Sequence, residues 1–171
     1  KLIQKSNTTP FEWLQSPIIY AELEGFRDDL WSLCQSYFYR KKNINHYLGI
    51  AKGAIDTISN GDEIKIKKLF YVLRPLLSAK WCLEKNTIAP MQIGPLLSII
   101  PDELQNMIDE LIVLKSTSAE AFVIKINQEL RVFIEDEFIK CSNAAKGLDK
   151  ESFNAEELDK FFRHTVKNHD N

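Results

Sequence analysis

Most of the chain places apolar residues three or four positions apart, which is the spacing of one face of an α-helix. The pattern starts at Ala21, resumes after "RKKNIN" at Tyr47 and stops at "SNGD" (59–62), so two helices or one bent helix are expected. Residues 63–86 open with the strand-like alternation "EIKIK" but continue with helical spacing over three turns. We therefore predict a helix there.

The two ends of the chain follow the same spacing less regularly. "KLIQKSN" is predicted to be the tail of a helix, and "TTPFEWLQSPIIY" a short amphipathic turn. Pro101 and the two acids after it predict a helix start. A long helix is predicted from Ser118 to about Gly147, although the β-branched run "FVIKI" leaves a strand open. A last helix follows Asn154, which is placed to cap it.

These segments predict an all-α fold, a bundle of about five to six helices. With 171 residues and 44% hydrophobic content, one helical domain over residues 1–171 can bury a core. Within it we expect the end of a helix and an amphipathic turn at 1–20, core helices at 21–85 and C-terminal helices at 86–171.

The formal net charge of −2 hides an uneven distribution of charge. Residues 40–85 carry ten Lys or Arg against four Asp or Glu, a net charge of +6, between flanks with −2 (1–39) and −6 (86–171). We call residues 40–85 the basic island. A local excess of one sign attracts ligands of the other sign, although many charge runs only solvate a helix face. Both interpretations stay open from the sequence.

The cysteines and the apolar runs bear on the compartment. Cys34, Cys82 and Cys141 lie far apart within apolar helical patterns, as expected for buried thiols of a reducing, cytoplasmic environment. Their spacing matches no zinc site. No apolar run approaches the ~18 residues of a membrane span, so no membrane association is expected.

Motifs for phosphoryl chemistry are missing from the chain. No glycine is followed by serine, and the sequence contains neither Asp-x-Asp nor a glycine-rich phosphate loop. Metal-assisted nucleotidyl transfer needs carboxylates close together to hold the cations. The acidic clusters at 28–29 and 135–137 are interpreted as solvated faces. We therefore expect no metal site and no cofactor within these residues.

The first cationic cluster is "HYLGIAKG", residues 46–53. On a helix, His46 lies over Gly49 and Gly53, which leave room beside it. That room suits either a ligand groove or a close helix crossing.

The second cluster is "KLFYVLRPLLSAKW". Lys67, Tyr71, Arg74 and Ser78 form one polar stripe on an otherwise apolar helix, and Pro75 removes a backbone N–H beside it. Arginine suits phosphate recognition but suits carboxylates equally well, so Arg74 either binds an anion or pairs with an acid such as Glu12 or Glu22.

Three phrases, "EWLQSPIIY", "HYLGIAKG" and "LFYVLRPLLSAKW", together resemble the predicted nucleotidyltransferases of the DNA polymerase beta superfamily, the RNA-ligase-associated enzymes of RNA repair. The resemblance covers residues 1–81 well and is weaker from Lys85 onward. It implies a small mixed-sheet catalytic core with a Gly-Ser motif and paired aspartates that bind magnesium, followed by a helical region. The chain, which opens mid-pattern at Lys1, is then expected to be the helical C-terminal part of a larger α+β enzyme.

The resemblance also implies ligands and partners. A nucleoside triphosphate, and RNA as an acceptor, are the expected ligands, and the chain's own upstream catalytic core is the expected partner. The intact enzyme is expected to use magnesium, whereas this helical part is expected to be inactive by itself. The alternative from the residues is a non-catalytic interaction module whose basic line meets an acidic protein.

The expected nucleotide- and phosphate-binding residues come from both cationic clusters. Lys80 stands where the family often has arginine, and a lysine there supplies a point charge instead of a planar fork. The complete set is His46, Tyr47, Lys52, Lys67, Tyr71, Arg74, Lys80 and Trp81.

Overall fold

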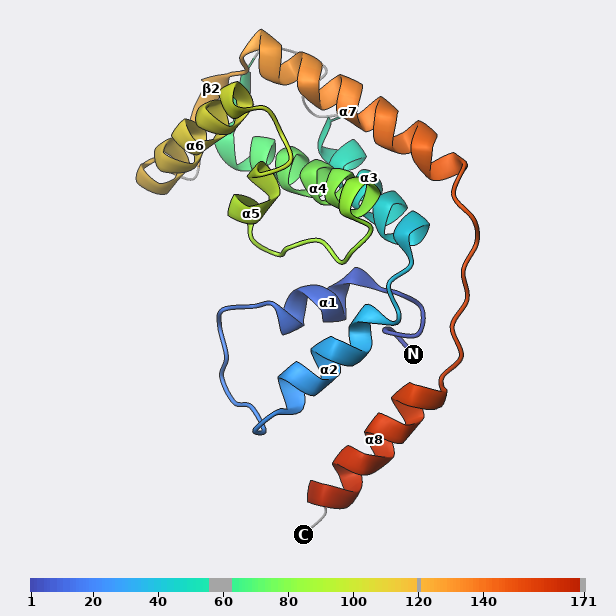
Figure 1. Cartoon of the computed structure of the whole chain (residues 1–171). Helices are drawn as coiled ribbons and strands as arrows, with labels where there is room; N and C mark the ends of the chain where they lie inside the picture. Colours follow the sequence, from blue (N-terminus) through green and yellow to red (C-terminus); the bar gives the residue numbers. More distant parts are fainter. Residues whose placement is uncertain (56–62, 120, 170–171) are drawn as a thin grey trace.

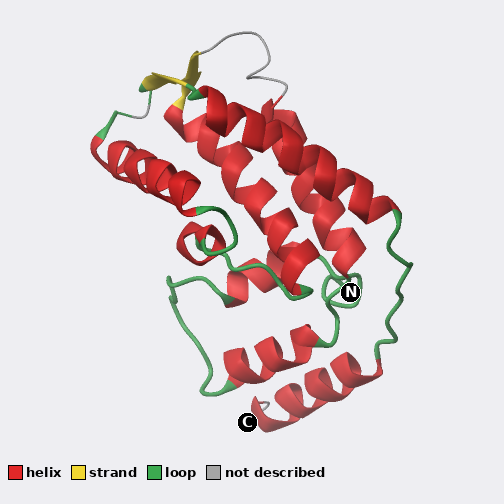
Figure 2. Cartoon of the chain, turned by 45° about the horizontal axis from the view of Figure 1, so that its top comes forward, coloured by secondary structure: helices red, strands yellow, loops and turns green. Residues whose placement is uncertain are grey.

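The fold is that of a computed structural model, which describes residues 1–55, 63–119 and 121–169. It is built from helices and one small two-stranded antiparallel sheet, so the all-α prediction is confirmed (Figures 1 and 2). Eight helices are described where about five to six were expected. The helices α1 and α5 are too short for apolar spacing to predict them. The elements are α1 (Thr8–Leu14), α2 (Phe26–Gln35), α3 (Arg40–Ile55), β1 (Glu63–Lys65), α4 (Ile66–Lys85), α5 (Ile93–Leu97), α6 (Asp102–Thr117), β2 (Val123–Lys125), α7 (Gln128–Lys146) and α8 (Glu156–His169).

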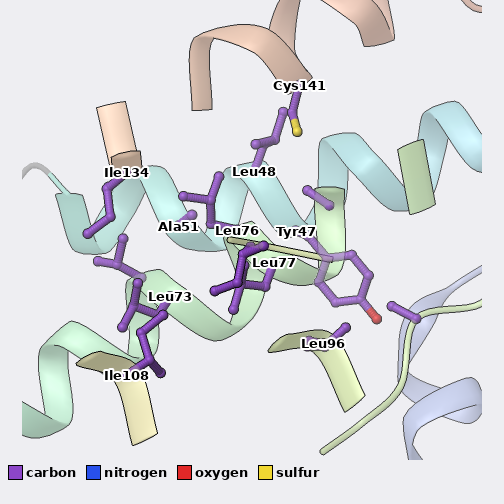
Figure 3. Packing of buried hydrophobic residues seen from close by; sticks show 14 of the residues in the cluster. Tyr47, Leu48, Ala51, Leu73, Leu76, Leu77, Leu96, Ile108, Ile134 and Cys141 are labelled. Atoms are coloured by element: carbon purple, nitrogen blue, oxygen red, sulfur yellow. The ribbon is translucent and has the colours of Figure 1, made fainter. Parts of the chain in front are cut away.

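Helix α4 occupies the centre of the main core. It packs against α3, α5, α6 and α7, and its apolar residues meet those of its neighbours (Figure 3). The side chains of α4 that are completely buried lie on several sides of the helix, as expected for an element surrounded by others. They include Leu69, Val72, Leu73, Leu76, Leu77, Ala79 and Cys82.

A second, smaller cluster joins the N-terminal helices to the main body. Phe11 of α1, Cys34 of α2 and Ile88 are its buried members, and Phe38 packs against both clusters. An extended segment leads from α7 back to α8, which lies beside α2 (Figure 1). The rings of Phe26 and Phe161 meet there at 5.5 Å.

Two predicted helical segments begin as strands. β1 and β2 pair antiparallel with Ile64 opposite Ile124, at the end of the molecule far from α1, α2 and α8 (Figure 2). The predicted helix from Ser118 is therefore wrong in its first part. The β-branched run forms β2, and α7 starts only at Gln128, where the Asn127 side chain accepts the Glu129 N–H at 2.7 Å.

The N-terminal predictions also need correction. Residues 1–7 form turns instead of a helix tail, and Ser6 has a left-handed φ of 50°. Asn7 caps α1 by accepting the Thr9 N–H at 2.9 Å. The segment from 21 is two helices, of which the first begins at Phe26. The predicted stop at "SNGD" lies outside the described residues.

For Gly49 and Gly53 of α3, the sequence left either a ligand groove or a close helix crossing open. A Cβ on Gly49 or Gly53 would meet no described atom within 4 Å. A close helix crossing at these glycines is therefore excluded within the described part of the chain, and the space beside them is open.

The first turn of α3 brings basic side chains to the ends of other helices. Arg40 donates from its Nε to the Cys82 carbonyl at 3.2 Å and from Nη2 to the Leu83 carbonyl, in the last turn of α4. Lys41 donates to the carbonyl of Leu148 at 2.6 Å and to that of Lys146 at 3.3 Å, at the end of α7. Carbonyls at helix C-termini lack helical partners and carry partial negative charge, so cations stabilise them. These two charges of the basic island therefore stabilise the fold.

A buried ion pair joins α4 to α7. Lys80 Nζ lies 3.0 Å from Glu137 and 2.7 Å from Glu84, and the side chains of Lys80 and Glu137 are only 7% and 8% exposed. Burial by itself lowers the pKa of Lys80, but its hydrogen bonds to Glu84 and Glu137 outweigh burial, and the pKa is raised. Lys80 is therefore held as a charged structural residue.

We predict that Arg40→Ala lowers the free energy of unfolding by about 1–3 kcal/mol, because it leaves carbonyls at the end of α4 without their charged donor. Urea unfolding followed by far-UV circular dichroism measures this. Lys150→Ala, in the exposed segment after α7, is the control and should stay within about 0.5 kcal/mol of the unmodified chain. Equal stability of Arg40→Ala and the control would contradict the capping role.

We predict that Lys80→Met lowers the free energy of unfolding by about 3–5 kcal/mol, because the nearly buried Glu137 carboxylate loses its closest cation. It then keeps only Lys140, a largely exposed side chain whose Nζ lies 3.6 Å away. The double variant Lys80→Met with Glu137→Leu should recover most of that loss, because both charges are then gone. The same unfolding experiment measures both variants. A stable single variant with weakened phosphate binding would instead assign Lys80 to a ligand site.

Candidate functional site

A groove runs beside the exposed stripe of α4. It has a volume of about 460 Å³, and we call it the α4 groove. Five helices contribute to it, which is why its residues are scattered along the chain (Figure 1). Its lining residues are Glu12 of α1, Ile50 of α3, Lys67, Phe70, Tyr71, Arg74 and Pro75 of α4, Ile93 of α5 and Lys115 of α6.

The lining combines an aromatic surface with cations. Tyr71 is 56% exposed, whereas Phe70 is partly buried. Lys67 lies one helical turn before Tyr71, on the same face of α4. From the neighbouring helix α6, Lys115 places its Nζ 5.0 Å from the centre of the Phe70 ring, within the range of a cation–π contact. An aromatic face beside ammonium groups can hold a planar, anionic ligand.

Glu12, in the first of the three family-like phrases, forms hydrogen bonds to one residue in each of the other two. Its Oε1 accepts a hydrogen bond from Arg74 Nη2 at 2.8 Å and from the Tyr47 hydroxyl at 3.3 Å. The predicted alternative that Arg74 pairs with an acid is confirmed for Glu12. Tyr47 itself is buried in the core (Figure 3). Burial, followed by the negative charge of Glu12, raises the pKa of Tyr47, so its hydroxyl stays a donor.

Arg74 is fixed from two directions. Besides its ion pair with Glu12, its Nε donates to the Met91 carbonyl at 2.7 Å. The side chain keeps 30% of its surface exposed. The guanidinium is therefore already oriented in the lining of the groove. An incoming anion would compete with the Glu12 carboxylate for its N–H donors, or share them with it. Ser78, the last residue of the predicted stripe, is buried and donates to the Arg74 carbonyl at 2.9 Å.

The structure divides the predicted site residues into two groups. Lys67, Tyr71 and Arg74 line the groove, and Tyr47 reaches its wall through Glu12. The others do not line it, namely His46 and Lys52, which are exposed on α3, and Lys80 and Trp81, in the second half of α4.

Trp81 and Lys80 lie away from the groove because of the length of α4. Lys80 is nine residues beyond Tyr71, which is about 14 Å along a helix. Trp81 is partly buried against the main core, and its Nε1 donates to the Thr87 hydroxyl at 3.0 Å. Both side chains thus take part in packing where the sequence suggested ligand contacts.

Sequence reasoning missed several lining residues. Lys115 belongs to an acidic segment and carries no local signal of a site, because only the packing of α6 on α4 brings it to the groove. Phe70 follows the apolar helical spacing of α4, which by itself gives no sign of a ligand site. Glu12 was considered only as a partner of Arg74.

The cysteine thiols and the acidic residues offer no further chemistry. Burial raises the pKa of Cys34, Cys82 and Cys141 to about 12, which keeps these thiols protonated. In the described part of the chain, no group of three or more His, Cys, Asp or Glu side chains is placed to bind a metal. These residues therefore do not fit the magnesium that the family resemblance implies for the intact enzyme.

None of the described helices is both long enough and apolar enough to cross a bilayer.

Comparisons with known proteins place the chain in a family. The uncharacterized protein YcgL of Bacillus subtilis (strain 168) is 32% identical over 170 residues, which cover 98% of this chain and 65% of the length of YcgL. No solved structure matches the chain. The model of the RNA repair pathway DNA polymerase beta family matches residues 1–164, nearly the whole length. The chain belongs to this family.

Proposed function

We propose that this chain is the helical, substrate-side part of a nucleotidyltransferase that acts in RNA repair. In this proposal the enzyme transfers a nucleoside monophosphate from a nucleoside triphosphate to an acceptor such as an RNA end. The α4 groove holds the phosphates or base of the ligand. The Gly-Ser and paired aspartate motifs are absent from these 171 residues, so catalysis needs a separate catalytic core, which we place upstream.

Family membership supports the reaction class, and the groove supports the role of this part. The observation that carries the proposal is that three of the residues expected to bind nucleotide, Lys67, Tyr71 and Arg74, line one groove together. Cationic side chains aimed at phosphate groups are the main contribution of a protein to nucleotidyl and phosphoryl transfer besides metal. The greater length of YcgL is consistent with a further region that carries the catalytic motifs.

The alternative is a helical module whose basic groove binds an acidic protein. It predicts that charge reversal at Lys67 and Lys68 abolishes partner binding while nucleotide binding stays intact. Our proposal predicts instead that this charge reversal weakens nucleotide binding, because Lys67 lines the groove and in the proposal contacts the ligand directly.

We predict that the chain binds adenosine triphosphate in a salt-dependent manner and that Lys67→Ala weakens binding about tenfold, the effect of one lost charged contact of about 1.4 kcal/mol. Isothermal titration calorimetry at 50 and 200 mM salt measures this. Arg74→Lys should also weaken binding, because lysine lacks the planar fork.

Lys52→Ala is the control, since Lys52 lies on the same basic island but outside the groove. Its affinity should equal that of the unmodified chain. The role of the groove would be refuted if Lys67→Ala and Arg74→Lys both bound triphosphate as tightly as the unmodified chain while their far-UV circular dichroism spectra showed that they are folded.

A further inference from the structure

Lys115 reaches the α4 groove from a part of the chain that is otherwise acidic. It lies in the last turn of α6, where a cation is also favoured by the helix dipole. Its ammonium sits over the ring of Phe70, 5.0 Å from the ring centre, in the same lining as Lys67 and Tyr71. A ring face attracts the charge of an ammonium but does not occupy all three of its N–H donors. Lys115 is thus held at the groove while it still has donors for an anion.

We propose that Lys115 is the second phosphate-contacting lysine of the groove, and that the groove takes a single nucleotide whose base lies against Tyr71. Lys67 and Lys115 then contact the phosphates from two different helices, α4 and α6, and Phe70 is the positioning residue for Lys115. This inference rests on the proposed function, because it assigns ligand contacts within the same groove.

The size of the groove favours one nucleotide over a nucleic-acid strand. A volume of about 460 Å³ falls in the range of small-molecule sites, about 300–1,000 Å³. Proteins that hold single strands instead offer an extended basic groove with successive aromatic platforms. Tyr71 is the one strongly exposed aromatic side chain among the described residues that line this groove.

The lining offers a suitable surface to each of the two parts of a nucleotide, the base and the phosphates. Tyr71 and Ile50 supply exposed ring and aliphatic surface, whereas the ammonium groups lie at Lys67 and Lys115. The carboxylate of Glu12 is paired with Arg74 at 2.8 Å, so its repulsion of phosphate is reduced. Stacking on the aromatic surface and charge contacts to phosphate should therefore both contribute to affinity.

The test titrates the 171-residue chain with adenosine triphosphate, inorganic tripolyphosphate, adenosine and a ten-nucleotide RNA by calorimetry. We expect Lys115→Ala to weaken adenosine triphosphate binding five- to tenfold and Lys115→Arg to retain it. Phe70→Leu, which keeps an apolar wall but removes the ring, should weaken binding two- to threefold. Lys150→Ala, outside the groove, is the matched control and should leave affinity unchanged. Adenosine triphosphate should bind more tightly than tripolyphosphate, adenosine or the RNA.

The outcomes separate this inference from the proposed function. Normal affinity in a folded Lys115→Ala variant, together with weak binding in Lys67→Ala, would overturn the role of Lys115 and leave the proposed function standing. Tighter binding of the RNA than of the triphosphate would overturn the single-nucleotide ligand, again without refuting a role in RNA repair. Failure of the unmodified chain to bind any of the four probes would overturn both.

Discussion

The burial of α4 is the constraint on which the rest of the structure depends. A helix whose side chains Leu69, Leu77 and Cys82, on different sides, are completely covered needs several neighbours, and α3, α5, α6 and α7 supply them. Polar groups on such a helix have few acceptable positions. They must reach the surface, as Lys67 and Tyr71 do at the α4 groove, and any charge that is buried must be paired. An unpaired buried charge costs several kcal/mol, about 3–5 when one partner of a buried pair is lost.

This constraint divides the charges of the basic island. Arg40 and Lys41 bind carbonyls at the ends of α4 and α7, and Lys80 pairs with Glu137 inside the core. These charges are used by the fold. Two further charges of the island, Lys67 and Arg74, line the α4 groove, and Arg74 is paired there with Glu12. The excess of positive charge in the sequence therefore overstates the charge offered to a ligand, while Lys115, from outside the island, adds to it.

The sequence predicted what depends on local order. Helical spacing identified the central helices, and the stripe of Lys67, Tyr71 and Arg74 follows directly from helix geometry. The two-stranded sheet was missed because each strand is only three residues long and adjoins a longer helical pattern. Its pairing joins residues about sixty positions apart, which no local spacing can reveal.

The site was predicted in part for the same reason. Residues on one helix could be assigned to one face, but the wall opposite α4 comes from other helices. Lys115 meets Phe70 only through packing of α6, and Lys80 lies within reach of Glu137 only through packing of α7. Both lysines look alike in the sequence, yet one faces a groove and the other is buried. Tertiary contacts decide which lysine can meet a ligand.

The most direct test is a titration of the isotopically labelled chain with adenosine triphosphate, followed by two-dimensional amide NMR spectra. The account predicts shifts concentrated at Lys67, Tyr71, Arg74 and Lys115, with little change at 40–42 and 80–81. Shifts concentrated at 40–42 and 80–81, with the groove residues unchanged, would contradict it.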